Sequence, residues 1–114
     1  MARTIDLIFS VLLLIGAALH GYGTFDGYEV GSEVFVWSLS GVLAAALVAA
    51  LNLLRRARPG DKTIAWLALF GSVAWVAIAL MFGSAIGNIA DPRAVWHVIA
   101  ALALSGFSLQ AVLR

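Results

Sequence analysis

Residues 34–54 read VFVWSLSGVLAAALVAALNLL, an apolar stretch that contains no Asp, Glu, Lys or Arg. Its length matches the ~20 residues that an α-helix needs to cross ~30 Å of hydrocarbon. Three further apolar stretches of similar length occupy residues 5–22, 63–82 and 92–113. A bilayer accepts only helices or closed barrels, and the ~10-residue alternating pattern of a barrel strand is absent. We therefore expect four membrane-spanning helices.

The composition of the chain agrees with this expectation. Of 114 residues, 63% are hydrophobic and 11% are charged, whereas roughly a quarter of the residues in a soluble domain are charged. The chain has no cysteine, which excludes disulfides and thiolate metal ligands. We interpret residues 1–114 as a single all-α integral membrane domain.

The second half of the chain repeats features of the first at an offset of about 59 positions. Arg3-Thr4-Ile5 aligns with Lys62-Thr63-Ile64, Val36-Trp37 with Val95-Trp96, and Leu54-Arg55 with Leu113-Arg114. This favours two tandem helical hairpins, residues 3–55 and 62–114, joined by a cytoplasmic turn at residues 56–61. Such hairpins would be parallel repeats in an up-down-up-down four-helix bundle. Constraints common to all membrane helices are the alternative explanation of the similarity.

Residues 5–22 also have an alternative interpretation as a secretory signal, because Arg3 precedes an apolar run that ends in small residues. We favour a retained helix, since the offset pairs this stretch with residues 63–82, which lie inside the chain.

The basic residues divide unequally between the two sides of a four-span zigzag. Six of the seven fall on one side: Arg3, Arg55, Arg56, Arg58, Lys62 and Arg114. Arg93 lies on the other side, with Asp26, Glu29, Glu33 and Asp91. The positive-inside rule then places both termini and the turn at residues 56–61 in the cytoplasm of a bacterial-type inner membrane. We interpret the arginine cluster as a topology determinant, with binding of anionic lipid as a weaker alternative; nucleic acid is not an expected partner.

Helix-capping residues indicate where the helices begin. Ser32, Asp61 and Asp91 each precede an apolar stretch and have side chains that cap helix N-termini, and Pro92 suits the first helical position. Residues 21–33 are rich in glycine, which favours a flexible connector over an ordered recognition loop. We expect Asp6 to lie in the first helical turn and to complement the helix dipole.

Small residues at spacings of three or four predict the faces on which the helices pack. Small side chains let helix backbones approach closely in a bilayer, where apolar contact alone gives little preference for protein over lipid. The predicted packing positions are Gly16, Gly41, Ala45, Ala49, Gly83, Gly87, Ala101 and Ser105.

His20 and His97 are the candidate cofactor ligands. Each lies about 25 Å from the basic end of its helix, at a rise of ~1.5 Å per residue, so the two share a depth. If the first and fourth helices are neighbours, the imidazoles could ligate haem, or bind a transition metal together with a carboxylate. Two histidines without a third ligand are weak evidence, and structural hydrogen bonding is the favoured interpretation. Trp75 lies in mid-span, where its indole N–H needs a partner.

These observations predict a non-enzymatic membrane protein. Our favoured hypothesis is a structural or accessory subunit, or a self-associating bundle, whose partners are the lipid bilayer and other membrane subunits or copies of itself. A haem or metal protein using His20 and His97 is the first alternative, although no cofactor is favoured. A transporter or channel for a neutral or lipophilic solute is the second. It predicts a hydrated cavity among polar side chains of the spans, namely Ser38, Asn52, Ser72, Ser105 and Ser108.

Overall fold

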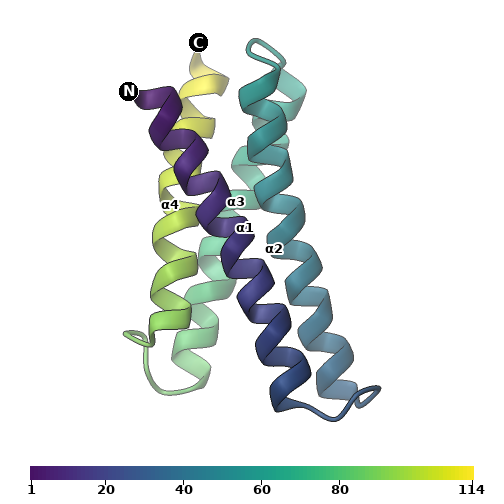
Figure 1. Cartoon of the computed structure of the whole chain (residues 1–114). Helices are drawn as coiled ribbons and strands as arrows, with labels where there is room; N and C mark the ends of the chain where they lie inside the picture. Colours follow the sequence, from purple (N-terminus) through teal and green to yellow (C-terminus); the bar gives the residue numbers. More distant parts are fainter.

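The computed structural model describes residues 1–114 and contains four α-helices and no strands. The helices are α1 (Ala2–Gly27), α2 (Glu33–Ala57), α3 (Lys62–Ala85) and α4 (Pro92–Leu113). Successive helices run in opposite directions, and both chain ends lie at the same end of the bundle (Figure 1). All four helices are long and apolar enough to cross a membrane. The predicted all-α class and the number of helices are confirmed.

A capping side chain begins three of the four helices: Ser32 for α2, Asp61 for α3 and Asp91 for α4. Each side-chain oxygen accepts a hydrogen bond of 2.9–3.3 Å from a backbone amide in the first turn. Such bonds satisfy amides that have no partner within the helix. Pro92 occupies the start of α4, where no amide donor is needed. The predicted helix starts are confirmed.

Three of the four helices extend further than the apolar stretches predict, while α4 matches its stretch. α1 continues to Gly27, so the predicted connector at residues 21–33 is wrong in extent and only residues 28–32 join α1 to α2. α2 continues to Ala57 and therefore contains Arg55. The tight turn that follows includes Gly60 at φ +92°, a left-handed conformation that favours glycine.

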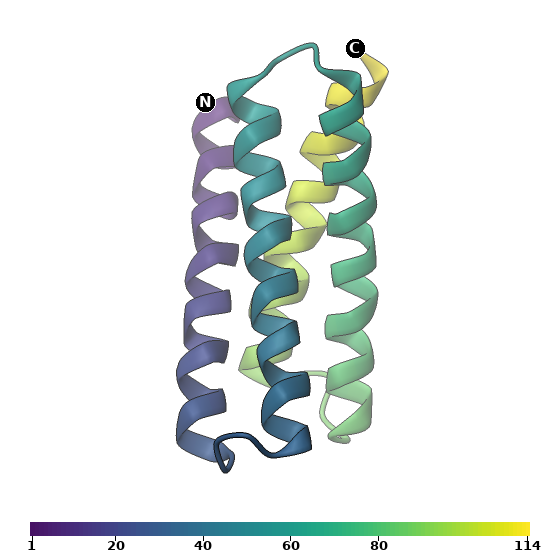
Figure 2. The ribbon, with the colours of Figure 1, turned by 90° about the vertical axis from the view of Figure 1, so that its right-hand side faces the viewer.

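The helices form a ring in chain order, because α4 closes against α1 (Figure 2). The α1–α2 and α3–α4 pairs have the most extensive contacts, and the α2–α3 and α1–α4 contacts are smaller. The interior is filled largely by small side chains, with Ala45, Ala49 and Ala101 fully buried beside Leu13 and Leu104. Close packing of each hairpin on itself therefore dominates the fold.

The outer surface of every helix carries large apolar side chains. Examples are Leu19 on α1, Trp37 on α2, Phe70 on α3 and Leu102 on α4, which are 59–76% exposed. Contiguous exposed apolar surface of this extent is typical of a membrane-facing protein and is unfavourable in water.

Candidate functional site

A buried ion pair joins α1 to α2. The guanidinium of Arg55 donates to both carboxylate oxygens of Asp6, from Nη2 to Oδ1 at 2.7 Å and from Nη1 to Oδ2 at 3.1 Å. Asp6 is 5% exposed and Arg55 is 7% exposed. Burying a charge is costly unless an opposite charge pairs with it in good geometry. The bidentate pairing therefore allows both side chains to be buried.

Asn52 connects this ion pair to the other two helices. Its Oδ1 accepts hydrogen bonds from Arg55 Nη2 at 3.2 Å and from Ser108 Oγ of α4 at 2.9 Å. Its Nδ2 donates to Ser72 Oγ of α3 at 2.9 Å and to the Val48 carbonyl. All four hydrogen-bonding positions of the amide are therefore occupied. We call Asp6, Asn52, Arg55, Ser72 and Ser108 the four-helix network.

The structure corrects the predicted role of two of these residues. Asp6 is not in the first turn of α1, which begins at Ala2 and has no acidic residue there. Arg55 differs from the other arginines of the predicted cluster, because its side chain turns into the bundle and pairs with Asp6. Attraction between the two opposite charges across the hairpin outweighs the preference of each for the interface.

The polar side chains among which a transporter would need a hydrated cavity have hydrogen-bonding partners within the bundle. Asn52, Ser72 and Ser108 are fully buried, and both serines bond to the Asn52 amide. Ser105 donates to the Ala101 carbonyl of its own helix, and Ser38 lies near the other end, bonded to Thr24. The serines therefore satisfy neighbouring side chains and carbonyls instead of lining one shared space.

We predict that Asp6→Leu and Arg55→Met each destabilise the bundle by about 3–5 kcal/mol, because each leaves one buried charge without its counter-charge. The double variant Asp6→Leu/Arg55→Met removes both charges and is expected to recover most of the loss. Reversible unfolding in mild detergent, followed by circular dichroism, measures the three free energies. Losses that simply add in the double variant would contradict a buried, coupled pair.

The histidines lie towards the opposite end of the bundle. His97 of α4 is half-buried, and its Nδ1 accepts a hydrogen bond of 3.0 Å from Trp75 Nε1 of α3. The exposed His20 of α1 forms a longer contact of 3.4 Å between its Nε2 and Ser38 Oγ of α2. The structure thus gives Trp75 the partner that its mid-span position requires. It also gives each histidine a hydrogen-bonding partner in the other helix of its own hairpin.

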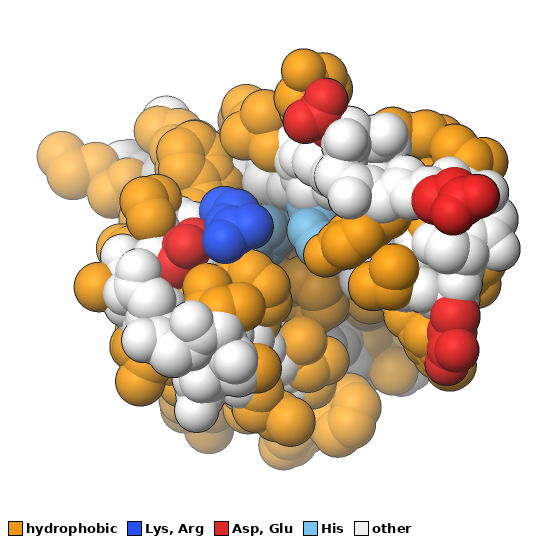
Figure 3. Space-filling model, turned by 90° about the horizontal axis from the view of Figure 1, so that it is seen from below, with side chains coloured by type: hydrophobic (Ala, Val, Ile, Leu, Met, Phe, Trp, Pro, Cys, Tyr) orange, Lys and Arg blue, Asp and Glu red, His pale blue; other side chains and the backbone are white.

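Both histidines can be followed in Figure 3, which looks onto this end of the bundle. Their side chains lie in a hollow next to a basic side chain, and acidic side chains lie at several points around it. Asp91 and Arg93, at the start of α4, form a surface ion pair with Nε and Oδ1 2.9 Å apart. The hydrogen bond from the Arg93 side chain holds the pKa of Asp91 below its ordinary value. No group of three His, Asp or Glu side chains is placed to hold a metal ion.

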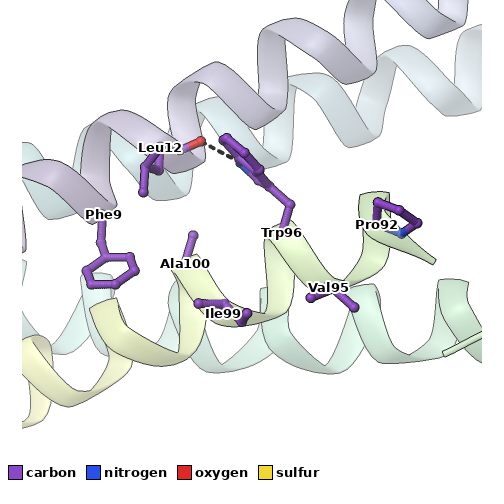
Figure 4. Close-up of a pocket in the computed structure, with 7 residues that line it drawn as sticks. All are labelled: Phe9, Leu12, Pro92, Val95, Trp96, Ile99 and Ala100. Carbon is purple, nitrogen blue, oxygen red and sulfur yellow. Dashed lines mark hydrogen bonds between the residues drawn. The ribbon is translucent and has the colours of Figure 1, made fainter. Parts of the chain in front are cut away.

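A second feature lies between α1 and α4, where the two hairpins meet. Trp96 Nε1 donates to the Leu12 carbonyl of α1 at 2.8 Å. Beside this bond is an apolar groove of about 260 Å³ on the outer surface, drawn in Figure 4. Its lining residues are Phe9, Leu12, Pro92, Val95, Trp96, Ile99 and Ala100.

Two of the predicted packing glycines make room for these side chains. A Cβ atom at Gly16 would lie 2.9 Å from Trp96 Nε1 and 3.0 Å from His97 Cε1. A Cβ atom at Gly41 would lie 3.3 Å from His20 Nε2. The absence of a side chain at these positions therefore allows the aromatic rings of neighbouring helices to approach the backbone.

The other predicted packing positions differ in their surroundings. Ala45, Ala49 and Ala101 are fully buried, and Ser105 is 7% exposed. Gly83 is buried against the turn between α3 and α4. Gly87 lies in that turn, exposed and at φ +70° with no atom within 4 Å of a Cβ position. It does not contact a neighbouring helix, because α3 ends at Ala85.

We predict that Gly16→Ala destabilises the bundle by about 1–3 kcal/mol, since the added methyl group must displace the Trp96 ring from its bond to the Leu12 carbonyl. Gly106→Ala is the matched control, because no atom lies within 4 Å of its Cβ position. It is expected to be neutral or to stabilise α4 by up to about 1 kcal/mol. Equal effects of the two substitutions on thermal unfolding would contradict the close approach at Gly16.

Comparison of the chain with protein-family models, curated proteins and solved structures finds no match.

Proposed function

We propose that the protein is a small multi-pass protein of a bacterial-type inner membrane that acts by association, as a structural subunit of a membrane complex or as a self-associating bundle. The role is non-enzymatic. In this proposal the four helices are four spans, arranged as two tandem parallel hairpins.

The contrast between polar, hydrogen-bonded side chains inside the bundle and large apolar side chains outside it supports this proposal. Inside, the polar groups of the four-helix network bond to one another, with Asn52 using all its hydrogen-bonding groups on protein partners. Outside, each helix presents large apolar side chains. Membrane helices use such surfaces for contact with lipid and with other helices. The surface of the bundle is therefore the part that remains available for a function.

The hairpin architecture supports the same proposal. Each hairpin is held by its own contacts, through the ion pair in the first and the Trp75–His97 bond in the second. The two hairpins are then joined by Trp96 and by the serines bonded to Asn52. A compact unit bonded in this way can present one rigid surface to a partner.

Association can be tested by co-expressing two differently tagged copies and capturing one tag in mild detergent. We expect the captured material to contain the other copy, or a membrane protein in stoichiometric amount, and native mass spectrometry to give a complex heavier than the 12.0 kDa chain. A mass of one chain only, with nothing co-purifying, would contradict both forms of the proposal.

The proposed orientation can be tested because the chain has no cysteine of its own. Pro59→Cys places a thiol in the turn between α2 and α3, and Val30→Cys places one in the turn between α1 and α2. We expect a membrane-impermeant maleimide to label Val30→Cys on intact cells and Pro59→Cys only after lysis, because the arginine-rich turn is retained in the cytoplasm. The reverse pattern, or labelling of both on intact cells, would contradict the orientation.

A further inference from the structure

Positive charge is concentrated at the end of the bundle where both chain termini lie. We call this surface the basic end; its residues are Arg3, Arg56, Arg58, Lys62 and Arg114. The two acidic residues nearby are already engaged, because Asp6 pairs with Arg55 and Asp61 caps α3. Asp61 keeps its negative charge while it caps α3, so the five cations of the basic end still outnumber the unpaired carboxylates there.

Hydrogen bonds to backbone carbonyls place two of these cations, Arg56 and Lys62, beside helix ends that carry the others. Arg56 Nε of α2 donates to the Arg3 carbonyl of α1 at 3.1 Å, which places a guanidinium beside the helical turn that carries another. Lys62 Nζ of α3 donates to the Ala111 and Val112 carbonyls of α4 at 3.0 and 2.8 Å, next to Arg114. The bundle's salt bridges, Arg55–Asp6 and Arg93–Asp91, involve none of these four cations. Several positive charges gathered at one end of the bundle attract an anion.

The surroundings of the Arg3–Arg56 pair indicate what kind of anion fits. Farther along the same helices are exposed apolar side chains, with Ile5 37%, Ile8 49% and Leu54 39% exposed. A ligand that carries a phosphate joined to hydrocarbon chains can satisfy both surfaces at once. Arginine suits the phosphate, because its planar guanidinium can donate two parallel hydrogen bonds to phosphate oxygens.

We propose that the basic end binds the headgroup phosphates of anionic phospholipids, with Arg3 and Arg56 forming one site and Lys62 and Arg114 a second. Arg58, in the adjoining turn, adds positive charge to the surface. This interaction is independent of whether the bundle associates with other proteins, since the cations lie at the helix ends and the proposed protein contacts lie on the helix sides.

The test measures the lipids that remain bound when the protein is released from nanodiscs containing equal amounts of phosphatidylglycerol and phosphatidylcholine. Native mass spectrometry is expected to show preferential retention of phosphatidylglycerol by the wild type. Arg3→Gln/Arg56→Gln is expected to reduce this preference about fivefold for each charge removed. Raising the salt concentration is expected to weaken it further.

Two variants serve as controls. Arg93→Gln removes one positive charge from the opposite end of the bundle and is expected to leave the preference unchanged. Arg3→Lys/Arg56→Lys retains both charges and is expected to keep most of it. If the Gln variant fails to fold, the proposal is tested by thermal unfolding of the wild type in pure phosphatidylglycerol and in pure phosphatidylcholine. The wild type is expected to be more stable in phosphatidylglycerol. Equal retention of the two lipids by the wild type, or an equal loss in Arg93→Gln, would overturn the proposal.

A measurement with inorganic phosphate distinguishes a site for a lipid headgroup from a site for free phosphate. If the site recognises the lipid, millimolar phosphate in a phosphatidylcholine nanodisc should neither stabilise the wild type nor displace bound phosphatidylglycerol. Phosphate alone could instead stabilise the wild type as much as the anionic lipid does, with the effect lost in Arg3→Gln/Arg56→Gln. That result would show a site for free phosphate and would overturn the assignment to lipid.

Discussion

The arrangement of the four helices depends on the buried pair of Asp6 and Arg55 and on the amide of Asn52 that joins the pair to Ser72 and Ser108. Apolar contacts between membrane helices are weakly directional, because alanine and leucine side chains can contact lipid chains almost as favourably as each other. Hydrogen bonds and ion pairs have defined geometry and are costly to leave unmade in a medium of low polarity. A rotation of α1, or a sliding of α3 or α4 along α2, would break at least one bond of the four-helix network. The register of the bundle therefore follows from a few polar contacts, while the alanines supply close packing.

Sequence alone predicts the parts of this structure that depend on local chemistry. The caps at Ser32, Asp61 and Asp91 involve residues within a few positions of one another, and the structure confirms them and the number of helices. The ion pair joins residues 49 positions apart, and each residue lies near a helix end, where a charge normally meets water. A signal was nevertheless present. Asn52 and Arg55 continue the three-to-four-residue spacing of Ala45 and Ala49, which places them on the same buried face of α2.

The histidines illustrate a different limit of prediction from sequence. Their common depth left two interpretations open, structural hydrogen bonds and a shared ligand, because depth does not determine which neighbour a ring faces. The structure shows His97 bonded to Trp75 and His20 in contact with Ser38, so each histidine joins the two helices of one hairpin. The orientation of α4 about its own axis brings Trp96 against Leu12 and His97 towards Trp75, and the missing side chain at Gly16 leaves room for both rings. Sequence spacing predicted Gly16 as a packing position, but which side chains occupy the space beside it follows only from the structure.

The unequal division of charge between the two ends of the bundle has an electrical consequence in an energised membrane. Each elementary charge that crosses the bilayer gains or loses about 2.3 kcal/mol per 100 mV. Six of the seven basic side chains lie at one end and four acidic ones at the other, so in the proposed orientation the molecule would be a long electric dipole along the field. A resting voltage that is negative inside would hold the arginine-rich pole inward and oppose inversion, so the voltage itself would help to maintain the orientation after insertion.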